Sequence, residues 1–140
     1  MSLEYQSLLI VDDQPGVRRF LFEMLGDEGY LVDMAGSGAE AIRKVSARIP
    51  ALVLLDVKMP GLSGIETLEE IKKIAPDVPV VMMTAYGELE LLAESKKHGS
   101  GYYIRYYIKK PFNLEEICFL IKGILAEESE KKLRQAIGQA

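Results

Sequence analysis

Acidic side chains follow two apolar runs that lie far apart in the chain. Asp12 and Asp13 come directly after residues 8–11, and Asp56 comes directly after residues 52–55. If both runs are parallel strands, their carboxyl ends share the sheet edge where open α/β sheets bind ligands. Crowded carboxylates repel one another unless a cation compensates them. Because Mg²⁺ prefers a few carboxylates together with water and phosphate oxygens, the three acids predict a site for this ion.

Two further runs end in polar residues of other kinds. Thr84 follows residues 80–83, whereas Lys110 follows residues 106–109 and precedes Pro111. Taken singly, an acid at a strand end is more often a helix cap, and a Lys-Pro pair is more often a turn. Together, a divalent ion and an ammonium group would balance the three carboxylates and stabilise a phosphoryl group. Phosphoryl transfer requires mainly such positioning and charge stabilisation.

Two kinds of hydrophobic pattern alternate along the chain. Apolar runs alternate with amphipathic segments, which predicts alternating strands and helices and a parallel sheet. We expect the flavodoxin-like doubly wound α/β fold with strand order 2-1-3-4-5, helices on both faces, and the acids at the switch point between strands one and three. The expected strands are residues 7–11, 30–35, 51–56, 79–83 and a fifth just before Lys110. The expected helices run from Pro15 to before Gly29, over 38–48, to about Ile74, over about 87–98, and from Asn113. The first of them would present an apolar face formed by Val17, Phe20, Leu21, Met24 and Leu25.

Composition narrows the class of protein. A chain of 140 residues with 49% hydrophobic and 27% charged residues is typical of one globular domain. The sequence contains no apolar run long enough to span a membrane and no secretion signal, so we expect a cytoplasmic protein that binds no membrane. The single Cys118 excludes an internal disulfide and a cysteine metal site. A net charge of −4 gives no support for direct nucleic-acid binding.

The polar residues at the strand ends occur in a recognisable order over about residues 7–125. An acid pair, a single acid, a hydroxyl and a Lys-Pro pair in this order resemble the receiver domain of two-component response regulators, of the chemotaxis and sporulation type. Residues 83–88 are especially similar to those of sporulation-type phosphorelay receivers. The resemblance implies a phosphorylated signalling domain rather than an enzyme, with chemistry limited to self-phosphorylation and autodephosphorylation. Its partners would be a sensor histidine kinase or a histidine phosphotransfer protein, and an effector or output domain. We expect a monomer or a weak dimer.

The resemblance also assigns roles in the acidic site. Asp56 would be the phosphoacceptor and would also bind Mg²⁺. Asp13 would be a direct ligand of the ion, and Asp12 would act largely through water. The backbone carbonyl of Lys58 would supply a further ligand, which leaves the side chain of that residue free to vary.

Further roles concern the response to phosphorylation. Lys110 would pair with the phosphoryl oxygens, and Thr84 would donate a hydrogen bond to one of them. In the family, this hydroxyl moves together with an aromatic side chain of the fifth strand, which by position is Tyr107. The surface that changes would be formed by the fourth helix, the fifth strand and the fifth helix. The bond between Lys110 and Pro111 would be the cis peptide of the family.

One stretch departs from the family pattern. Residues 102–105 (Tyr-Tyr-Ile-Arg) are followed at once by residues 106–109 (Tyr-Tyr-Ile-Lys), and removal of one copy would restore the expected spacing to Lys110. The extra residues could be a tolerated loop insertion or an introduced alteration. They could instead extend an edge strand and change dimerisation or partner choice. A third possibility is that they disable the switch but not phosphorylation. An even insertion preserves the alternation of the strand, so Tyr107 keeps its face.

The expected organisation is a receiver domain over residues 4–126 and a helical extension, or the start of a linker, over residues 127–140. Two other functions remain open at this point. One is an interaction module that retains the fold but works without phosphorylation. The other is a phosphohydrolase or phosphotransferase with an aspartyl nucleophile, which normally has a general acid two residues after the nucleophile on the first strand. Gln14 and Pro15 after Asp13 do not supply that acid.

Overall fold

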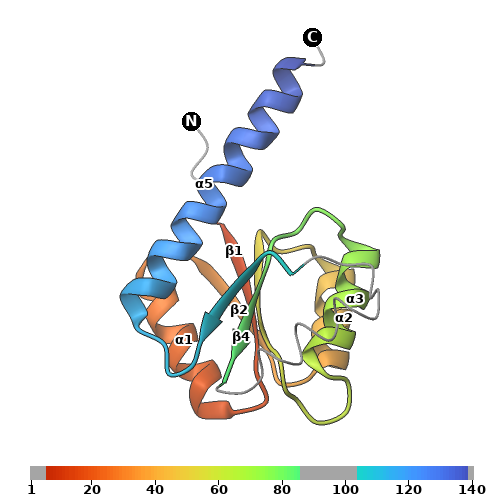
Figure 1. Cartoon of the computed structure of the whole chain (residues 1–140), viewed down its shortest axis with the longest axis vertical. Helices are drawn as coiled ribbons and strands as arrows, with labels where there is room; N and C mark the ends of the chain where they lie inside the picture. The colour runs from red at the N-terminus through yellow and green to blue at the C-terminus, as the bar shows by residue number, and fades with distance from the viewer. Residues whose placement is uncertain (1–5, 86–103, 139–140) are drawn as a thin grey trace.

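The computed structural model describes residues 6–85 and 104–138. It contains a five-stranded parallel sheet in the order β2-β1-β3-β4-β5 (Figure 1). The strands are β1 Ser7–Val11, β2 Leu31–Ala35, β3 Leu52–Asp56, β4 Val80–Thr84 and β5 Tyr106–Lys109. This topology confirms the predicted fold class and strand order.

Helices cover both faces of the sheet. They are α1 Pro15–Asp27, α2 Gly38–Ala47, α3 Gly64–Ile74 and α5 Leu114–Gly138. The helix expected over residues 87–98 lies outside the described residues. Local sequence explains several boundaries: α1 begins at a proline, and α3 begins with a reciprocal capping box between Ser63 and Glu66. Gly29, with φ of +98°, follows the end of α1.

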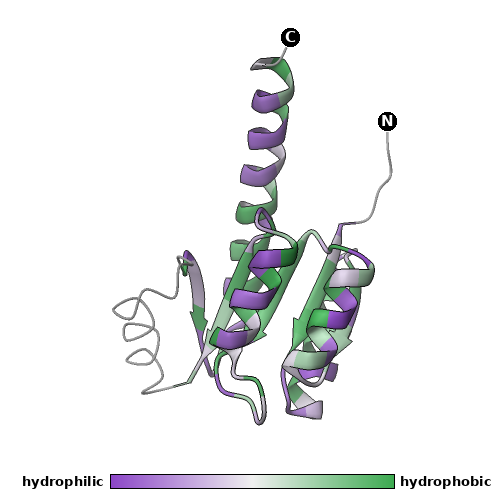
Figure 2. Ribbon diagram, turned by 90° about the vertical axis from the view of Figure 1, so that its right-hand side faces the viewer, coloured by the Kyte–Doolittle hydropathy of each residue, from purple (hydrophilic) through white to green (hydrophobic). Residues whose placement is uncertain are grey.

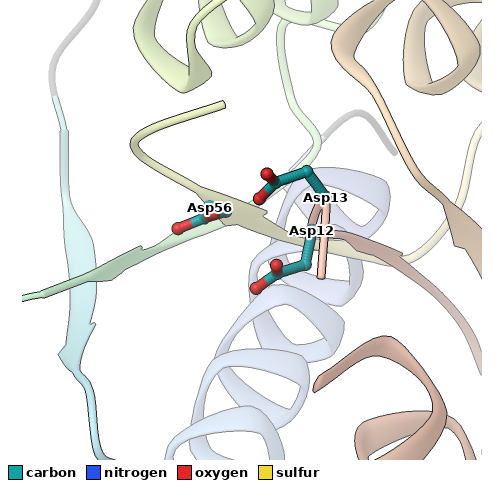
Figure 3. Close-up of side chains that lie close together, drawn as sticks. All are labelled: Asp12, Asp13 and Asp56. Atoms are coloured by element: carbon teal, nitrogen blue, oxygen red, sulfur yellow. The ribbon is translucent and has the colours of Figure 1, made fainter. Parts of the chain in front are cut away.

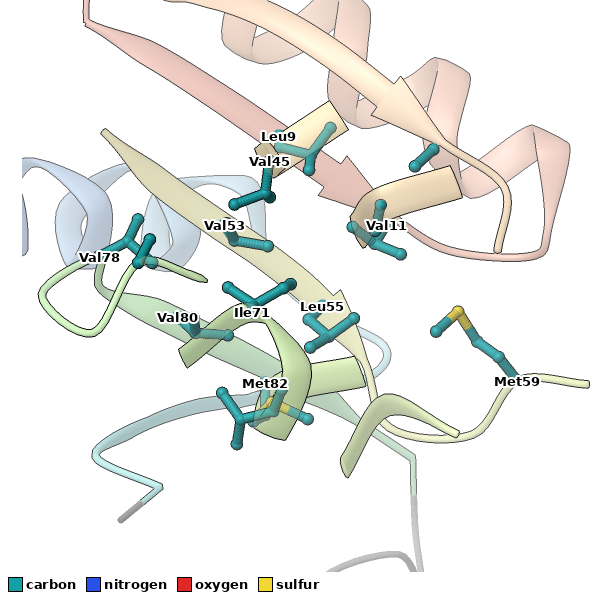
Figure 4. Close-up of a cluster of buried hydrophobic side chains, with 14 of the residues drawn as sticks. Leu9, Val11, Val45, Val53, Leu55, Met59, Ile71, Val78, Val80 and Met82 are labelled. Carbon is teal, nitrogen blue, oxygen red and sulfur yellow. The ribbon is translucent and has the colours of Figure 1, made fainter. Parts of the chain in front are cut away.

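The hydrophobic core has two layers, one on each side of the sheet. Helices α2 and α3 pack against one face, and α1 and the first part of α5 pack against the other (Figures 1 and 2). Figure 4 shows the first layer, in which Val45 and Ile71 lie against side chains of the central strands. Every residue of β3 and β4 is buried, as expected for central strands of a parallel sheet. The polar residues at the ends of these two strands are therefore supported by buried backbone on both faces of the sheet.

One side chain predicted to face the core does not. Phe20 is 46% exposed, whereas Leu21 and Leu25 of the same helix are fully buried. The buried stripe of α1 is centred between these two leucines, and at about 100° per residue Phe20 lies roughly 120° away from that centre. The predicted apolar face of α1 was therefore too wide.

The second copy of the tandem repeat forms β5. Residues Tyr106–Lys109 pair with β4, whereas Ile104 and Arg105 of the first copy precede the strand and do not extend it. Residues 102 and 103 lie outside the described part of the chain. Ile104 and Ile108 pack into opposite core layers, so the backbone does not maintain strand alternation between them.

Helix α5 continues without a break from Leu114 to Gly138, across the boundary expected at residue 126. Its buried residues end at Leu125, and beyond this point the helix extends away from the sheet (Figure 1). In the part of the chain that the structure describes, no helix is both long enough and apolar enough to cross a membrane.

Candidate functional site

The three predicted acids meet at the carboxyl end of the sheet. Asp12 and Asp13 follow β1, and Asp56 ends the neighbouring strand β3, whose residue Leu55 is the register partner of Val11. One carboxylate oxygen from each acid lies within 4.8 Å of the other two (Figure 3). The structure thus brings together, from two strands, the carboxylates that the sequence predicted to converge.

Lys110 joins this cluster from the loop after β5. Its Nζ donates a hydrogen bond to Asp12 Oδ2 at 2.8 Å and one to Asp56 Oδ1 at 3.2 Å. Burial by itself lowers the pKa of Lys110, but the hydrogen bond to Asp12 and the charges of Asp56 and Asp12 outweigh it and raise the pKa. The ammonium group therefore remains charged at neutral pH and links the ends of the first and third strands.

Asp12 and Asp13 have different surroundings although they are adjacent. Asp12 is fully buried, and its carboxylate accepts hydrogen bonds from the Gln14 backbone N–H at 2.9 Å and from Lys110. Asp13 is only partly buried and lines an open cleft together with Asp56 and Lys58. This difference supports a direct role in cation binding for Asp13 and an indirect one for Asp12.

The donor set fits a magnesium ion. Ligands on opposite sides of Mg²⁺, each about 2.1 Å from it, lie about 4.2 Å apart, so oxygens within 4.8 Å can reach one ion after a small adjustment. Three carboxylates and one ammonium group leave two net negative charges, which a divalent cation would balance. Lys58 lies on the rim of the same cleft with its side chain exposed, in keeping with a role for its backbone alone.

Thr84 lies at the end of β4, beside these acids. It is fully buried, and its Oγ1 has no hydrogen-bond partner among the described residues. Its backbone carbonyl accepts a hydrogen bond from the Lys110 N–H at 2.6 Å, so the two strand ends are fixed to one another. A buried hydroxyl without a partner is uncommon and calls for an explanation, such as a ligand that the site binds.

The loop between β3 and α3 contributes a residue whose role the sequence did not reveal. Of the two glycines in residues 61–64, Gly61 adopts a positive φ of +75°, whereas Gly64 does not. A Cβ on Gly64 would lie 2.0 Å from the Asp56 carbonyl oxygen and 2.7 Å from Val57 Cα. Gly64 is therefore needed because α3 begins in contact with the backbone of Asp56.

Two other expectations concern the end of β5. The Lys110–Pro111 peptide is cis, as the family resemblance implied. Tyr107 lies on the strand as expected, and its side chain is 51% exposed.

The strand order and the acidic cluster at the strand ends define a doubly wound α/β domain with a candidate cation site, and comparison with known families identifies its class. Residues 8–122 match the family model of the response regulator receiver domain. The chain therefore belongs to the receiver domain family of two-component response regulators, whose members are signalling domains.

Curated relatives include both short and long proteins. The chain is 42% identical over 124 residues to sporulation initiation phosphotransferase F of Bacillus subtilis (strain 168), covering 89% of this chain and 97% of that protein. It is 34% identical over 133 residues to the regulatory protein AtoC of Escherichia coli (strain K12), covering 95% of this chain but only 28% of that protein. Receivers of this kind thus occur both nearly alone and as parts of larger regulators.

Solved structures give the same result. A CheY-like receiver domain protein from Methanospirillum hungatei JF-1 superimposes with a TM-score of 0.82 at 31% identity, covering 91% of this chain and 99% of that one. The receiver domain of NtrX from Brucella abortus gives a TM-score of 0.75 at 31% identity, covering 85% and 98%.

Proposed function

We propose that this receiver accepts a phosphoryl group on Asp56 from a phosphohistidine, with Mg²⁺ bound beside it. The observation that carries the proposal is the placement of the Lys110 ammonium group between Asp12 and Asp56, next to Asp13 on an open cleft. This arrangement combines an acceptor oxygen, a donor set for a divalent cation and a fixed positive charge.

The reaction is a direct phosphoryl transfer. An oxygen of Asp56 forms a bond to phosphorus while the P–N bond of the phosphohistidine breaks, and the bonding electrons return to the imidazole nitrogen. When bound, Mg²⁺ would neutralise charge on the transferring group. Asp13, Asp56 and the Lys58 carbonyl would hold the ion, with Asp12 acting through water. Lys110 would supply a second positive charge to the phosphoryl oxygens.

We assign the response to phosphorylation to Thr84 and Tyr107. A phosphoryl oxygen on Asp56 would offer the buried Thr84 hydroxyl the acceptor that it lacks among the described residues. Movement of this hydroxyl would make room for Tyr107, now half-exposed on β5, to turn inward. The altered surface would include β5, the first part of α5 and residues 87–98, which lie outside the described residues. This is a population shift driven by contacts made only in the phosphorylated state.

The partners follow from the family. Receiver domains interact with histidine kinases or phosphotransfer proteins, so we assign a partner of this class to the chain. The similarity to a protein named sporulation initiation phosphotransferase F favours a place in a phosphorelay. Relatives such as AtoC are far longer than this chain, so an output domain on the same or another polypeptide would receive the signal. We place this signalling in the cytoplasm.

The test uses acetyl phosphate as a small phosphoryl donor. The wild-type protein should gain the mass of one phosphoryl group when incubated with acetyl phosphate and Mg²⁺, and should not gain it in excess EDTA. Asp56→Asn should abolish the gain because it replaces the nucleophilic carboxylate with a neutral amide of the same shape. Intact-protein mass spectrometry measures the mass gain of wild type and of the variant.

Asp27→Asn is the matched control, since Asp27 is an exposed acid in the last turn of α1, away from the cluster. It should be phosphorylated like wild type. A full mass gain in a folded Asp56→Asn variant would show that another residue is the acceptor. Absence of Mg²⁺ binding by the folded wild type in a calorimetric titration would contradict the proposed metal site.

A further inference from the structure

We infer that Arg18 in the first turn of α1 is a positioning residue for the divalent-cation site. Its side chain is not part of the acidic cluster, and it would act on the cation only through the backbone between Asp12 and Asp13. The inference rests on the proposed function, because it concerns the cation that serves phosphorylation.

The direct evidence is a hydrogen bond to the acid pair. Arg18 Nη1 donates to the backbone carbonyl of Asp12 at 2.7 Å, and Asp12 is fully buried. The N–H of Asp12 donates to the Ala35 carbonyl at 3.2 Å, and its carboxylate accepts from Gln14 and Lys110. Asp12 is therefore held at its amide, its carbonyl and its side chain.

The guanidinium group is itself held in place by the turn between β2 and α2. A Cβ on Gly36 would lie 3.1 Å from Arg18 Nη1 and 3.3 Å from Arg18 Cζ, so the guanidinium packs directly against this glycine. The turn is fixed in its own right, because the Gly36 N–H donates to Glu40 Oε2 at 3.3 Å and Ser37 caps α2. Gly36 thus provides the space in which the Arg18 side chain can reach the Asp12 carbonyl.

The consequence for the cation follows from the planar peptide bond. Because the Asp12 carbonyl and the Asp13 N–H belong to one rigid plane, fixing the carbonyl also fixes the direction in which the chain enters Asp13. Asp13 is the partly exposed acid that lines the cleft. Partners that orient a ligand in this way commonly determine metal affinity although they do not touch the metal.

A purely electrostatic role for Arg18 would have the opposite effect. A positive charge near three carboxylates opposes the binding of a cation, so its removal would strengthen Mg²⁺ binding if charge alone mattered. If Arg18 acts by positioning, its removal weakens Mg²⁺ binding, because Asp13 is no longer held toward the ion. The sign of the change in affinity therefore separates the two roles.

The experiment uses the chain of 140 residues and measures the Mg²⁺ dissociation constant by isothermal titration calorimetry for wild type, Arg18→Met, Arg18→Lys and Arg19→Met. Arg18→Met keeps an unbranched stem but removes the guanidinium group with its donors, and should weaken Mg²⁺ binding about tenfold. Arg18→Lys retains a donor and should restore part of the affinity. Arg19→Met is the matched control, since Arg19 is exposed and pairs only on the surface with Glu23 among the described residues, so its affinity should equal that of wild type.

A double-mutant cycle with Gly36→Ala tests the proposed contact. The added methyl group would press on the guanidinium and should weaken Mg²⁺ binding in wild type, but it should have no effect in the Arg18→Met background. Thermal unfolding in EDTA verifies that each variant is folded. Unchanged or tighter Mg²⁺ binding by folded Arg18→Met would overturn the inference, as would equal effects of Gly36→Ala in both backgrounds. If wild type itself binds no Mg²⁺ or is not phosphorylated, the proposed function fails instead, so the two failures are distinguishable.

Discussion

At the scale of single residues, the charge of Lys110 matters for the stability of the site as well as for the proposed phosphoryl transfer. It forms an ion pair at 2.8 Å with the buried carboxylate of Asp12 and one at 3.2 Å with Asp56, the proposed acceptor. The ammonium side chain is only 20% exposed and Asp12 is not exposed at all, so solvent screens this pair weakly. We therefore expect the residue proposed to bind the phosphoryl group to stabilise the folded protein as well.

Replacement of Lys110 should reveal this dependence as a function of pH. Lys110→Met leaves Asp12 buried without its cation, so the free energy of unfolding should fall by about 3 kcal/mol at pH 7 in EDTA. Because the pKa of Lys110 is raised above 10.5 in the folded protein, its contribution is fully present below pH 10.5. The contribution is lost as the pH rises through the higher folded-state pKa. Urea unfolding of both proteins between pH 6 and about pH 11 measures the difference.

The exposed neighbour Lys109 provides the control, since Lys109→Met removes an equal charge at the end of the same strand. It should change the unfolding free energy by less than about 0.5 kcal/mol. If the difference in unfolding free energy between wild type and Lys110→Met already declines between pH 7 and pH 9, the lysine loses its proton in that range, contrary to the raised pKa.

At the scale of elements, the site depends on how closely α3 approaches the end of β3. Gly64→Ala would place a methyl group against the backbone of Asp56 and Val57, which cannot move aside as a flexible side chain would. We expect the free energy of unfolding to fall by about 3 kcal/mol. We also expect weaker Mg²⁺ binding, because Asp56 must shift. Urea unfolding and calorimetric titration check the two effects.

The helix α1 contains a suitable comparison for this substitution. A Cβ on Gly26 would meet no atom within 4 Å, so Gly26→Ala should stabilise the protein by about 0.5–1 kcal/mol through the lower conformational entropy of alanine. A Gly64→Ala variant as stable as wild type would show that the start of α3 can move away from β3 without cost.

The sequence predicted those features of the elements that depend on local pattern and topology. Alternating hydrophobic periods predicted a parallel sheet, and the five strands and five helices fit the flavodoxin-like strand order, which determines which strand ends are neighbours. Asp13, Asp56, Thr84 and Lys110 could therefore be placed at one edge before any contact was known. Their roles in phosphorylation remain predictions.

What the sequence did not predict depends on the distance between packed elements. The contact of Arg18 with the Asp12 carbonyl and the approach of Gly64 to Asp56 are set by how helices dock on the sheet. The hydrophobic periodicity of the sequence does not reveal how closely a helix approaches the sheet. Phe20 was assigned to the core because it is apolar and close to Leu21, but the width of the buried stripe depends on neighbouring elements. Only Gly64 had a local signal, a glycine directly after the helix cap Ser63.

At the scale of the whole molecule, the receiver and the second half of α5 differ in how they are held. Ile121 and Ile124 are buried against the sheet, whereas no described residue after Leu125 is buried. Leu133 and Ile137 are 61% and 66% exposed. Figure 1 shows this part of the helix projecting beyond the rest of the structure. We propose that the folding unit ends near residue 126, as the sequence led us to expect.

Truncation after Ala126 tests this boundary. The shortened chain should lose less than about 1 kcal/mol of unfolding free energy, because the removed segment buries no side chain and its pairs, such as Glu127 with Arg105, are exposed. Ile124→Ala, just inside the boundary, should instead cost about 2–5 kcal/mol. Sedimentation of both chains at several concentrations tests the expected monomer or weak dimer: association that disappears on truncation would assign the contact to the removed segment, which carries the exposed Leu133 and Ile137. A loss above about 2 kcal/mol on truncation would contradict the boundary, since no exposed single helix of this length contributes that much.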